Sequence, residues 1–219
     1  MAKKQFDLIV FDWDGTLMDS TAAIVNAIQA SARDLGLPIP DRQSAAYVIG
    51  LGLQEAMRVA MPDIDPAFYP KVVERYRYHY LSKDRELVLF EGVREMVTDL
   101  SQRGYTLAVA TGKSRAGLNR AFADSRLGSL FQSSRCADET FSKPHPAMLQ
   151  ELTGELGHDM RRTVMIGDTT HDLQMALNAG ASSIAVHYGA HPPESLRALN
   201  PLYAADSVAQ LHTWLLENA

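Results

Sequence analysis

The feature that most constrains the fold is a set of short apolar runs, each of which meets a glycine or a polar residue at its end. The runs FDLIVF, YTLAVAT, RTVMIGD and SSIAVHY begin at residues 6, 105, 162 and 182. Their length and β-branched composition are typical of strands buried on both faces of a parallel sheet. Segments with helical periodicity lie between them. Strands that alternate with helices predict an α/β domain with a doubly wound, Rossmann-like parallel sheet.

One connection is too long for a single crossover. About 90 residues separate the first run from the run at residue 105, whereas a crossover between parallel strands needs little more than a dozen. Apolar residues such as Ile24 and Ile28 fall on helical faces there, and prolines separate the predicted helices. We therefore predict a core of residues 1–18 and 88–219, with a small helical cap domain, residues 19–87, inserted after the first strand.

Composition disfavours several kinds of partner and location. A net charge of −5 provides no general attraction to nucleic acid or to anionic membranes. The apolar stretch near the N-terminus is too short and too acidic for a signal sequence or a membrane span. The single cysteine, Cys136, suits a reducing compartment and indicates packing rather than redox chemistry. We expect a cytoplasmic protein with no nucleic-acid or membrane partner, and the sequence does not predict the oligomeric state.

Two aspartates, Asp12 and Asp14, directly follow the first apolar run, and Gly15 comes next. Residues two apart in a strand point to the same face, and ligands of open α/β sheets bind outside the carboxyl ends of the strands. Neighbouring carboxylates repel each other unless a cation or a proton intervenes. A turn with helix-capping aspartates accounts well for one carboxylate and poorly for two. The pair therefore favours a cation site at this edge of the sheet.

Three other segments supply groups that the aspartate pair lacks. ATGKSR places Thr111 and Gly112 at a strand end, where a hydroxyl and backbone N–H groups can hold phosphate oxygens. SKPHP places Lys143 just ahead of a helix, and GDTTHD places Asp168 at a strand end with Asp172 one helical turn later. Each segment alone is explained by helix capping or by a solvated lysine. Together they favour a magnesium and phosphate site, because Mg²⁺ prefers hard oxygen ligands.

Phosphoryl transfer is the reaction that uses all of these groups. Asp12 would attack the phosphorus of a phosphomonoester, while Mg²⁺, Lys143 and the donors at Thr111 and Gly112 neutralise the phosphate charge. Asp14 would protonate the leaving oxygen and then activate water. We predict a magnesium-dependent phosphatase that hydrolyses a small phosphorylated metabolite through an aspartyl-phosphate intermediate.

The segments DWDGT, ATGKS, SKPHP and GDTTHD resemble, in order and spacing, the four motifs of the haloacid dehalogenase superfamily, and most resemble its phosphoglycolate phosphatase-like subgroup. The resemblance covers nearly the whole chain, including the helical insert. It implies that Asp12 is both nucleophile and metal ligand. It also implies that Asp14 is the acid/base and binds the metal through its backbone carbonyl, and that Asp168 is the third protein ligand.

The resemblance implies further roles around the phosphate. Thr111 and Lys143 would hold the transferring group, and Asp172 would be an outer metal ligand or would orient Lys143. The cap would open for substrate, close to exclude water, and carry the residues that select the substrate.

Other activities stay open at this point. Asp14 disfavours the dehalogenases proper, which lack this second aspartate, and the phosphonate hydrolases, which have alanine in its place. An inorganic or nucleotide pyrophosphatase and a phosphohexomutase of the same superfamily fit the motifs. A non-enzymatic alternative is a receiver-like phosphoacceptor switch, but such a switch needs neither Asp14 nor an inserted cap.

Residues for substrate selection are less well defined. The segment VIGLGLQEA offers Gly50 and Gly52 for a bend toward the cleft and leads to Arg58 as an anion contact. Lys113 and Arg115 follow the phosphate motif and would either bind a second anionic group or line the rim.

Histidines and tyrosines in these segments have simpler interpretations. The spacing of the histidines does not indicate a metal site, and surface positions account for His145 and His171. A set of tyrosines is assigned to the core and the amphipathic surface of the helical insert, with ligand stacking as the less favoured alternative: Tyr69, Tyr76, Tyr78 and Tyr80.

Overall fold

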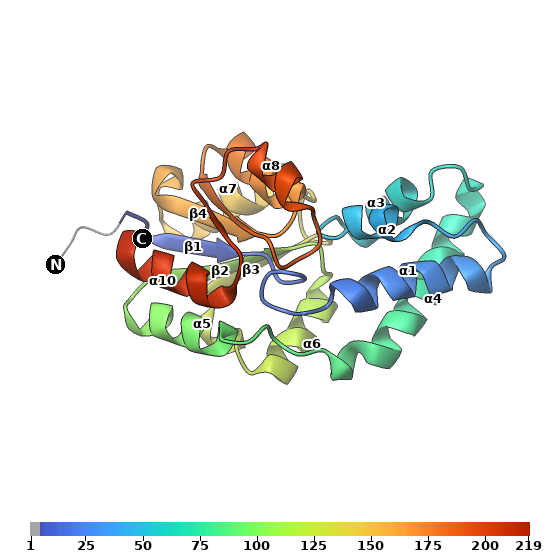
Figure 1. Cartoon of the computed structure of the whole chain (residues 1–219), viewed down its shortest axis with the longest axis horizontal. Helices are drawn as coiled ribbons and strands as arrows, with labels where there is room; N and C mark the ends of the chain where they lie inside the picture. Colours follow the sequence, from blue (N-terminus) through green and yellow to red (C-terminus); the bar gives the residue numbers. More distant parts are fainter. Residues whose placement is uncertain (1–4) are drawn as a thin grey trace.

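Six parallel strands form a single sheet in this computed structural model, which describes residues 5–219, the side chain of residue 85 excepted (Figure 1). The strand order is β3-β2-β1-β4-β5-β6, so the chain begins in the middle, builds outward to one edge and returns to the other side of β1. This topology confirms the predicted doubly wound α/β sheet. The strands are β1 (Leu8–Phe11), β2 (Thr106–Thr111), β3 (Ser133–Cys136), β4 (Thr163–Gly167), β5 (Ser182–Val186) and β6 (Tyr203–Ala205).

Helices connect the strands and cover both faces of the sheet (Figure 1). The α-helices are α1 (Thr21–Asp34), α2 (Arg42–Tyr47), α3 (Leu53–Ala60), α4 (Tyr69–Lys83), α5 (Val93–Gln102), α6 (Arg115–Ser125), α7 (Ala147–Leu156), α8 (Thr170–Ala179), α9 (Pro193–Arg197) and α10 (Val208–Asn218). Short 3-10 turns span Pro66–Phe68, Asp84–Glu86, Gly128–Leu130 and Met160–Arg162. No helix among residues 5–219 has the length and apolar character needed to cross a membrane.

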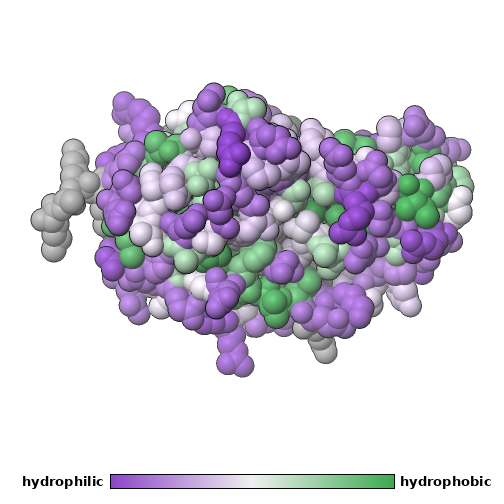
Figure 2. All heavy atoms as spheres, in the orientation of Figure 1, coloured by the Kyte–Doolittle hydropathy of each residue, from purple (hydrophilic) through white to green (hydrophobic). Residues whose placement is uncertain are grey.

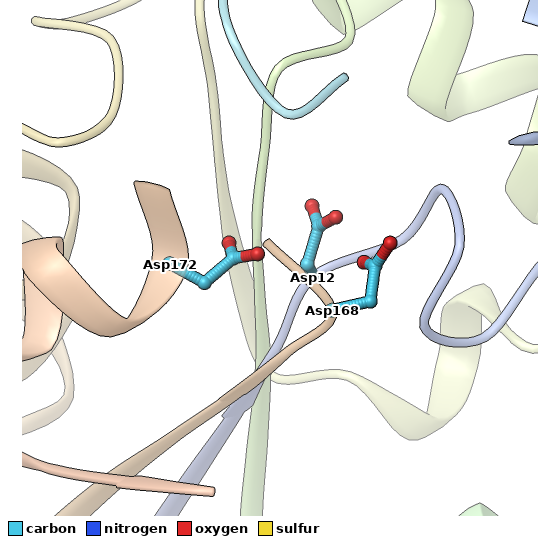
Figure 3. A group of neighbouring side chains, drawn as sticks. All are labelled: Asp12, Asp168 and Asp172. Carbon is cyan, nitrogen blue, oxygen red and sulfur yellow. The ribbon is translucent and has the colours of Figure 1, made fainter. Parts of the chain in front are cut away.

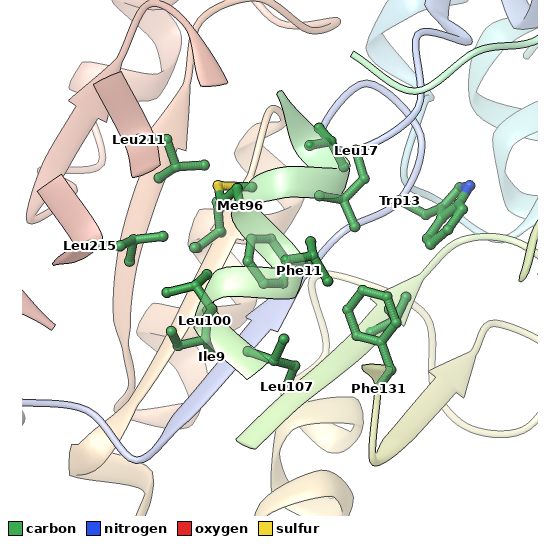
Figure 4. Packing of buried hydrophobic residues seen from close by; sticks show 14 of the residues in the cluster. Ile9, Phe11, Trp13, Leu17, Met96, Leu100, Leu107, Phe131, Leu211 and Leu215 are labelled. Carbon is green, nitrogen blue, oxygen red and sulfur yellow. The ribbon is translucent and has the colours of Figure 1, made fainter. Parts of the chain in front are cut away.

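The central strand β1 divides its side chains between two hydrophobic clusters. Ile9 and Phe11 pack on the face covered by α5 and α10 (Figure 4). Leu8 and Val10 pack on the opposite face against α7 and α8. All four side chains are fully buried, and burial of each such side chain is worth about 1.5–3 kcal/mol. The strand therefore anchors the residues that follow it.

The helices α1 to α4 lie beyond the carboxyl ends of the strands (Figure 1). They have a hydrophobic cluster of their own, in which α1 packs against α4 and residues such as Val25 and Val72 are buried. On the face drawn in Figure 2, hydrophilic side chains are intermixed with smaller apolar groups over both the helical layer and the sheet-containing part. The assignment of residues 19–87 to a separate cap domain stays a prediction.

Two strands were not predicted from the sequence. Strand β3 has the polar sequence SSRC and is mostly half-buried, and β6 has only three residues. Both lie at sheet edges, where a strand needs few apolar side chains. Cys136 ends β3 inside the core, and burial raises the pKa of its thiol to about 12, which agrees with a packing role.

Candidate active site

Three buried aspartates meet at the carboxyl edge of the sheet (Figure 3). Asp12 follows β1, Asp168 follows β4, and Asp172 lies in the first turn of α8. Each contributes a carboxylate oxygen to a group whose members lie within 4.8 Å of one another. Strands β1 and β4 are neighbours at the point where the strand order reverses. Ligands of doubly wound sheets bind at such a point.

The ammonium group of Lys143 lies between two of these carboxylates. Its Nζ is 2.6 Å from Asp12 Oδ1 and 2.6 Å from Asp172 Oδ1, and its side chain is fully buried. Burial alone would lower the pKa of Lys143, but the charges of Asp12 and Asp172 outweigh it and raise the pKa above its ordinary value. The lysine is therefore a fixed positive charge.

One ammonium does not balance three carboxylates. Burial raises the pKa of Asp12 to about 7, and burial together with the charge of Asp12 raises the pKa of Asp168 well above its ordinary value. Asp12 Oδ2 is buried and has no hydrogen-bond partner among the residues described. A cluster of hard oxygen ligands with surplus negative charge and a free oxygen fits a divalent cation.

Asp172 differs from the other two aspartates in its contacts. Its Oδ1 pairs with Lys143, and its Oδ2 accepts hydrogen bonds from the hydroxyl of Thr169 at 2.6 Å and from the Thr169 backbone N–H at 3.1 Å. Both oxygens of Asp168 also have partners, but these are neutral donors, the Thr16 hydroxyl at 2.8 Å and the Ala190 backbone N–H at 2.7 Å. Asp172 instead pairs with the Lys143 ammonium, so its contacts favour orientation of Lys143 over direct metal binding.

Asp14 lies apart from this cluster and contacts a second lysine. Its carboxylate accepts a hydrogen bond from Ser20 Oγ at 2.6 Å and pairs with Lys113 Nζ at 3.0 Å. Lys113 also donates to the Tyr80 hydroxyl of α4 at 2.8 Å. A side chain of the helical layer is thereby linked to the second aspartate of the DWDGT segment.

Gly15 permits the close approach of two strand ends. Its φ is +81°, and a Cβ atom there would lie 2.2 Å from Asp168 Oδ2. A larger residue would be strained and would also displace the Asp168 carboxylate. Thr16, the next residue, donates a hydrogen bond to Asp168 Oδ1 at 2.8 Å.

A cavity of about 780 Å³ opens above the strand ends, and Asp12, Asp14, Thr111 and Gly112 line it together with the helical layer. Thr111 is buried at the end of β2, and its Oγ1 accepts a hydrogen bond from the backbone N–H of Lys113 at 3.2 Å. Four predicted residues, Asp12, Lys143, Asp168 and Asp172, are in one cluster, and Thr111, Gly112 and Asp14 lie on the adjoining cavity wall. Their catalytic roles stay predictions.

Backbone groups of the helical layer also form hydrogen bonds with the sheet-containing part. The Gly52 N–H donates to Ser142 Oγ at 2.8 Å. The Tyr47 carbonyl accepts hydrogen bonds from Nε2 of His171 at 2.8 Å and of His191 at 3.0 Å. The Thr170 N–H donates to Nδ1 of His191, so the proton of the neutral His191 ring is on Nε2.

The interpretation of His171 as a surface residue is wrong. His171 is buried between α8 and the helical layer, because its ring donates to a carbonyl there, whereas His145 is exposed as expected. His191 was not singled out in the sequence. A histidine that binds a distant backbone carbonyl has no sequence pattern that would reveal it.

Two arginines considered for anion binding have other contacts. Arg115 donates to Glu139 Oε2 at 2.7 Å and to Ser134 Oγ at 2.7 Å. Arg58 does not line the cavity, and its guanidinium lies 6.0 Å from the ring centroid of Tyr69. Gly50 and Gly52 line the cavity, and Gly50 has a φ of +92°, as a bend toward the cleft requires.

Comparisons with known proteins agree with this geometry. Residues 9–186 match a family model described as haloacid dehalogenase-like hydrolase. A Dickeya dadantii protein named "Probable phosphatase IndB" is 38% identical over 93% of this chain and 91% of its own length. A phosphoglycolate phosphatase of Aliivibrio fischeri is 30% identical over 93% of this chain and 94% of its own length. The crystal structure of a predicted phosphatase from Clostridium acetobutylicum has the same fold, with a TM-score of 0.86, 24% identity and coverage of 98% of this chain and 100% of its own.

Replacement of Gly112 by alanine should displace the loop that closes the cavity. The new Cβ would lie 2.6 Å from the Gly50 carbonyl oxygen and 2.5 Å from that of Leu51. We expect amide hydrogen exchange at residues 50–52 to become faster by about tenfold or more, which corresponds to about 1.4 kcal/mol. Gly154→Ala is the matched control, because its Cβ would meet no atom within 4 Å. Unchanged exchange in Gly112→Ala would contradict the close contact.

Acid should weaken the fold through His191. Burial, followed by the charge of His171, lowers the pKa of His191 from 6.5 to about 4. Below pH 6.5 the unfolded ring therefore binds a proton that the folded ring does not, so stability falls as the pH falls toward 4. The loss is at most about 3 kcal/mol. Urea unfolding across this pH range should show a smaller decrease in the free energy of unfolding for His191→Gln than for the parent. His145→Gln, which changes an exposed ring, is the control and should show the same decrease as the parent. Equal losses in all three proteins would exclude His191 as the source.

Proposed function

The chain belongs to the haloacid dehalogenase-like hydrolase family, and from this premise we propose a magnesium-dependent phosphatase that cleaves small phosphomonoesters through an aspartyl-phosphate intermediate. Relatives that align with most of the chain are named as a probable phosphatase and a phosphoglycolate phosphatase. These names support an enzyme over a phosphoacceptor switch. The observation that carries the proposal is the Asp12 carboxylate, with one oxygen held by Lys143 and the other without a hydrogen-bond partner.

In the first half of the reaction, Asp12 attacks phosphorus and a new carboxylate O–P bond forms. The ester O–P bond breaks on the opposite side, and Asp14 supplies the proton that the leaving alkoxide takes up. Lys143 holds the Asp12 carboxylate in place, while Thr111 and the Gly112 N–H donate hydrogen bonds to the phosphoryl oxygens. Ser20 keeps the Asp14 carboxyl group oriented.

In the second half, Asp14 accepts a proton from water as the water oxygen attacks phosphorus. The bond between phosphorus and the Asp12 oxygen breaks, phosphate leaves, and both aspartates return to their starting states. Closure of the helical layer over the cavity would exclude bulk solvent during this step. Lys143 and Asp172 need not move in either half.

Asp12 and Asp168 are the side chains that would hold the cation. Bound there, Mg²⁺ supplies positive charge that offsets the repulsion between the nucleophile and the phosphate dianion. The surplus of buried carboxylates over ammonium groups and the free Asp12 Oδ2 support this assignment. We propose magnesium because the available ligands are all hard oxygen atoms.

Substitution of Asp12 by asparagine should abolish turnover, because an amide is a far weaker nucleophile than a carboxylate. We expect release of phosphate from phosphomonoesters to fall by about 10⁴-fold or more, with an unchanged circular dichroism spectrum. Asp63→Asn, which alters an exposed carboxylate of the helical layer, is the control and should retain parental activity. Parental turnover by Asp12→Asn would refute the proposed nucleophile.

Cation binding should be detectable without turnover. Added Mg²⁺ should raise the thermal unfolding midpoint of the parent protein, since a ligand at a hundred times its dissociation constant stabilises the fold by about 2.7 kcal/mol. Asp168→Asn should greatly reduce this shift, and the exposed-site variant Asp63→Asn should keep it. Activity should disappear with a chelator and return with excess Mg²⁺. A full shift in Asp168→Asn would place the cation elsewhere.

A further inference from the structure

The cavity between the strand ends and the helical layer is far larger and more apolar than a phosphate group requires. We infer that the substrate carries an apolar, ring-sized group on its phosphorylated hydroxyl, and that this group packs beneath the helical layer. The inference rests on the proposed phosphatase function and specifies its substrate class. It departs from the relatives named phosphoglycolate phosphatase, whose substrate name denotes a small acid.

The size of the cavity is the first observation. About 780 Å³ lies next to Asp12, and cavities of about 300–1,000 Å³ are typical of sites that enclose drug-sized ligands. Phosphate and the cation would occupy only the part against the strand ends. The remaining space lies against α1, α3, α4 and the loop after α2, all of which contribute lining residues.

The chemistry of the wall is the second observation. Two leucines that line the cavity, Leu53 and Leu81, keep apolar surface accessible, Leu81 at 47%. The apolar lining residues Ile28, Val48, Ile49 and Met57 are at most 3% exposed and belong to the hydrophobic cluster of the helical layer. Such side chains cannot hydrogen-bond to a carboxylate or a sugar hydroxyl, and a polar group placed against them would lose its hydration without compensation. An apolar group would gain free energy from the same contact.

The charges around the cavity disfavour a second anionic group. Among the described lining residues the only lysine is Lys113, which already pairs with Asp14 at 3.0 Å and hydrogen-bonds to Tyr80. The lining arginines, Arg77 and Arg120, are solvent-exposed. A carboxylate on the substrate would therefore meet no buried, unpaired cation among the described residues that line the cavity.

Two aromatic rings favour a flat group. Tyr76 and Tyr80 of α4 line the cavity and stack on each other, with ring centroids 5.7 Å apart and an interplanar angle of 16°. Tyr80 also links to Lys113 beside Asp14, so the aromatic pair adjoins the proposed acid. A substrate ring here would lie next to the oxygen that leaves phosphorus.

The test compares three phosphomonoesters of primary alcohols, so that intrinsic reactivity is similar. These are benzyl phosphate, 2-phosphoglycolate and glycerol 3-phosphate, each assayed with Mg²⁺ and the full chain. We expect the KM of benzyl phosphate to be about tenfold or more below the KM of either polar ester. A lower KM for 2-phosphoglycolate would overturn the inference and leave the phosphatase function intact.

Binding to Asp12→Asn, measured by calorimetry, separates the two proposals. Tighter binding of benzyl phosphate than of the polar esters would support the substrate class, whether or not the parent hydrolyses any ester. Absence of hydrolysis by the parent would refute only the phosphatase function. Equal or weaker binding of benzyl phosphate would overturn the substrate class.

Cavity variants provide the residue-level test. Leu53→Ala should weaken benzyl phosphate binding by about tenfold and leave 2-phosphoglycolate binding unchanged, because Leu53 lines the cavity with a half-buried apolar side chain. Val72→Ala is the matched control, since Val72 is fully buried in the hydrophobic cluster against which Leu53 packs but does not line the cavity. If Leu53→Ala does not fold, Leu81→Ala serves in its place. Loss of benzyl phosphate binding in Val72→Ala to the same extent would overturn the inference.

Discussion

The buried Lys143 ammonium, paired with Asp12 and Asp172, is the interaction on which the site depends. It connects β1, the segment before α7 and the first turn of α8, and Asp12 lies 131 positions from Lys143 in the chain. Removal of this ammonium would cost about 3–5 kcal/mol, because the buried carboxylates of Asp12 and Asp172 would be left uncompensated. The nucleophile is thus held by the same contact that stabilises the sheet edge, and its position cannot drift without loss of stability.

This arrangement leaves the sheet edge with a surplus of negative charge. Three carboxylates surround one ammonium, and burial raises the pKa of Asp12 to about 7. Such a cluster lowers the stability of the protein without a cation, a cost that functional sites often carry. The cluster is complementary to a divalent cation, and the neighbouring donors at Thr111 and Gly112 suit a phosphate dianion. Function and stability therefore make opposite demands on the same carboxylates.

The sequence predicted those parts of the molecule that depend on residue type. β-Branched runs predicted four of the six strands, and the parallel sheet then brought Asp12, Asp168 and Thr111 to one edge. It did not predict the edge strands β3 and β6, which are polar or very short. It also missed the contacts between the helical layer and the sheet-containing part, because those at Tyr47, Gly50 and Gly52 are made by backbone atoms and have no side-chain pattern. His171 is buried by these contacts, so the interpretation of His171 as a surface residue was wrong for the same reason.

The contacts between the helical layer and the sheet differ in kind from those inside the layer. Helices α1 to α4 share a continuous apolar cluster, whereas hydrogen bonds at Tyr47, Gly52 and Tyr80 attach the layer to the sheet-containing part. Each such bond is worth about 0.5–1.5 kcal/mol, far less than the cluster. We therefore propose that the layer separates from the strand ends as a unit without unfolding. The proposed reacting groups all belong to the sheet edge, and Tyr80 of the helical layer contacts them only through Lys113. The residues of the helical layer that surround the leaving group can therefore change in sequence while the phosphoryl-transfer geometry stays constant.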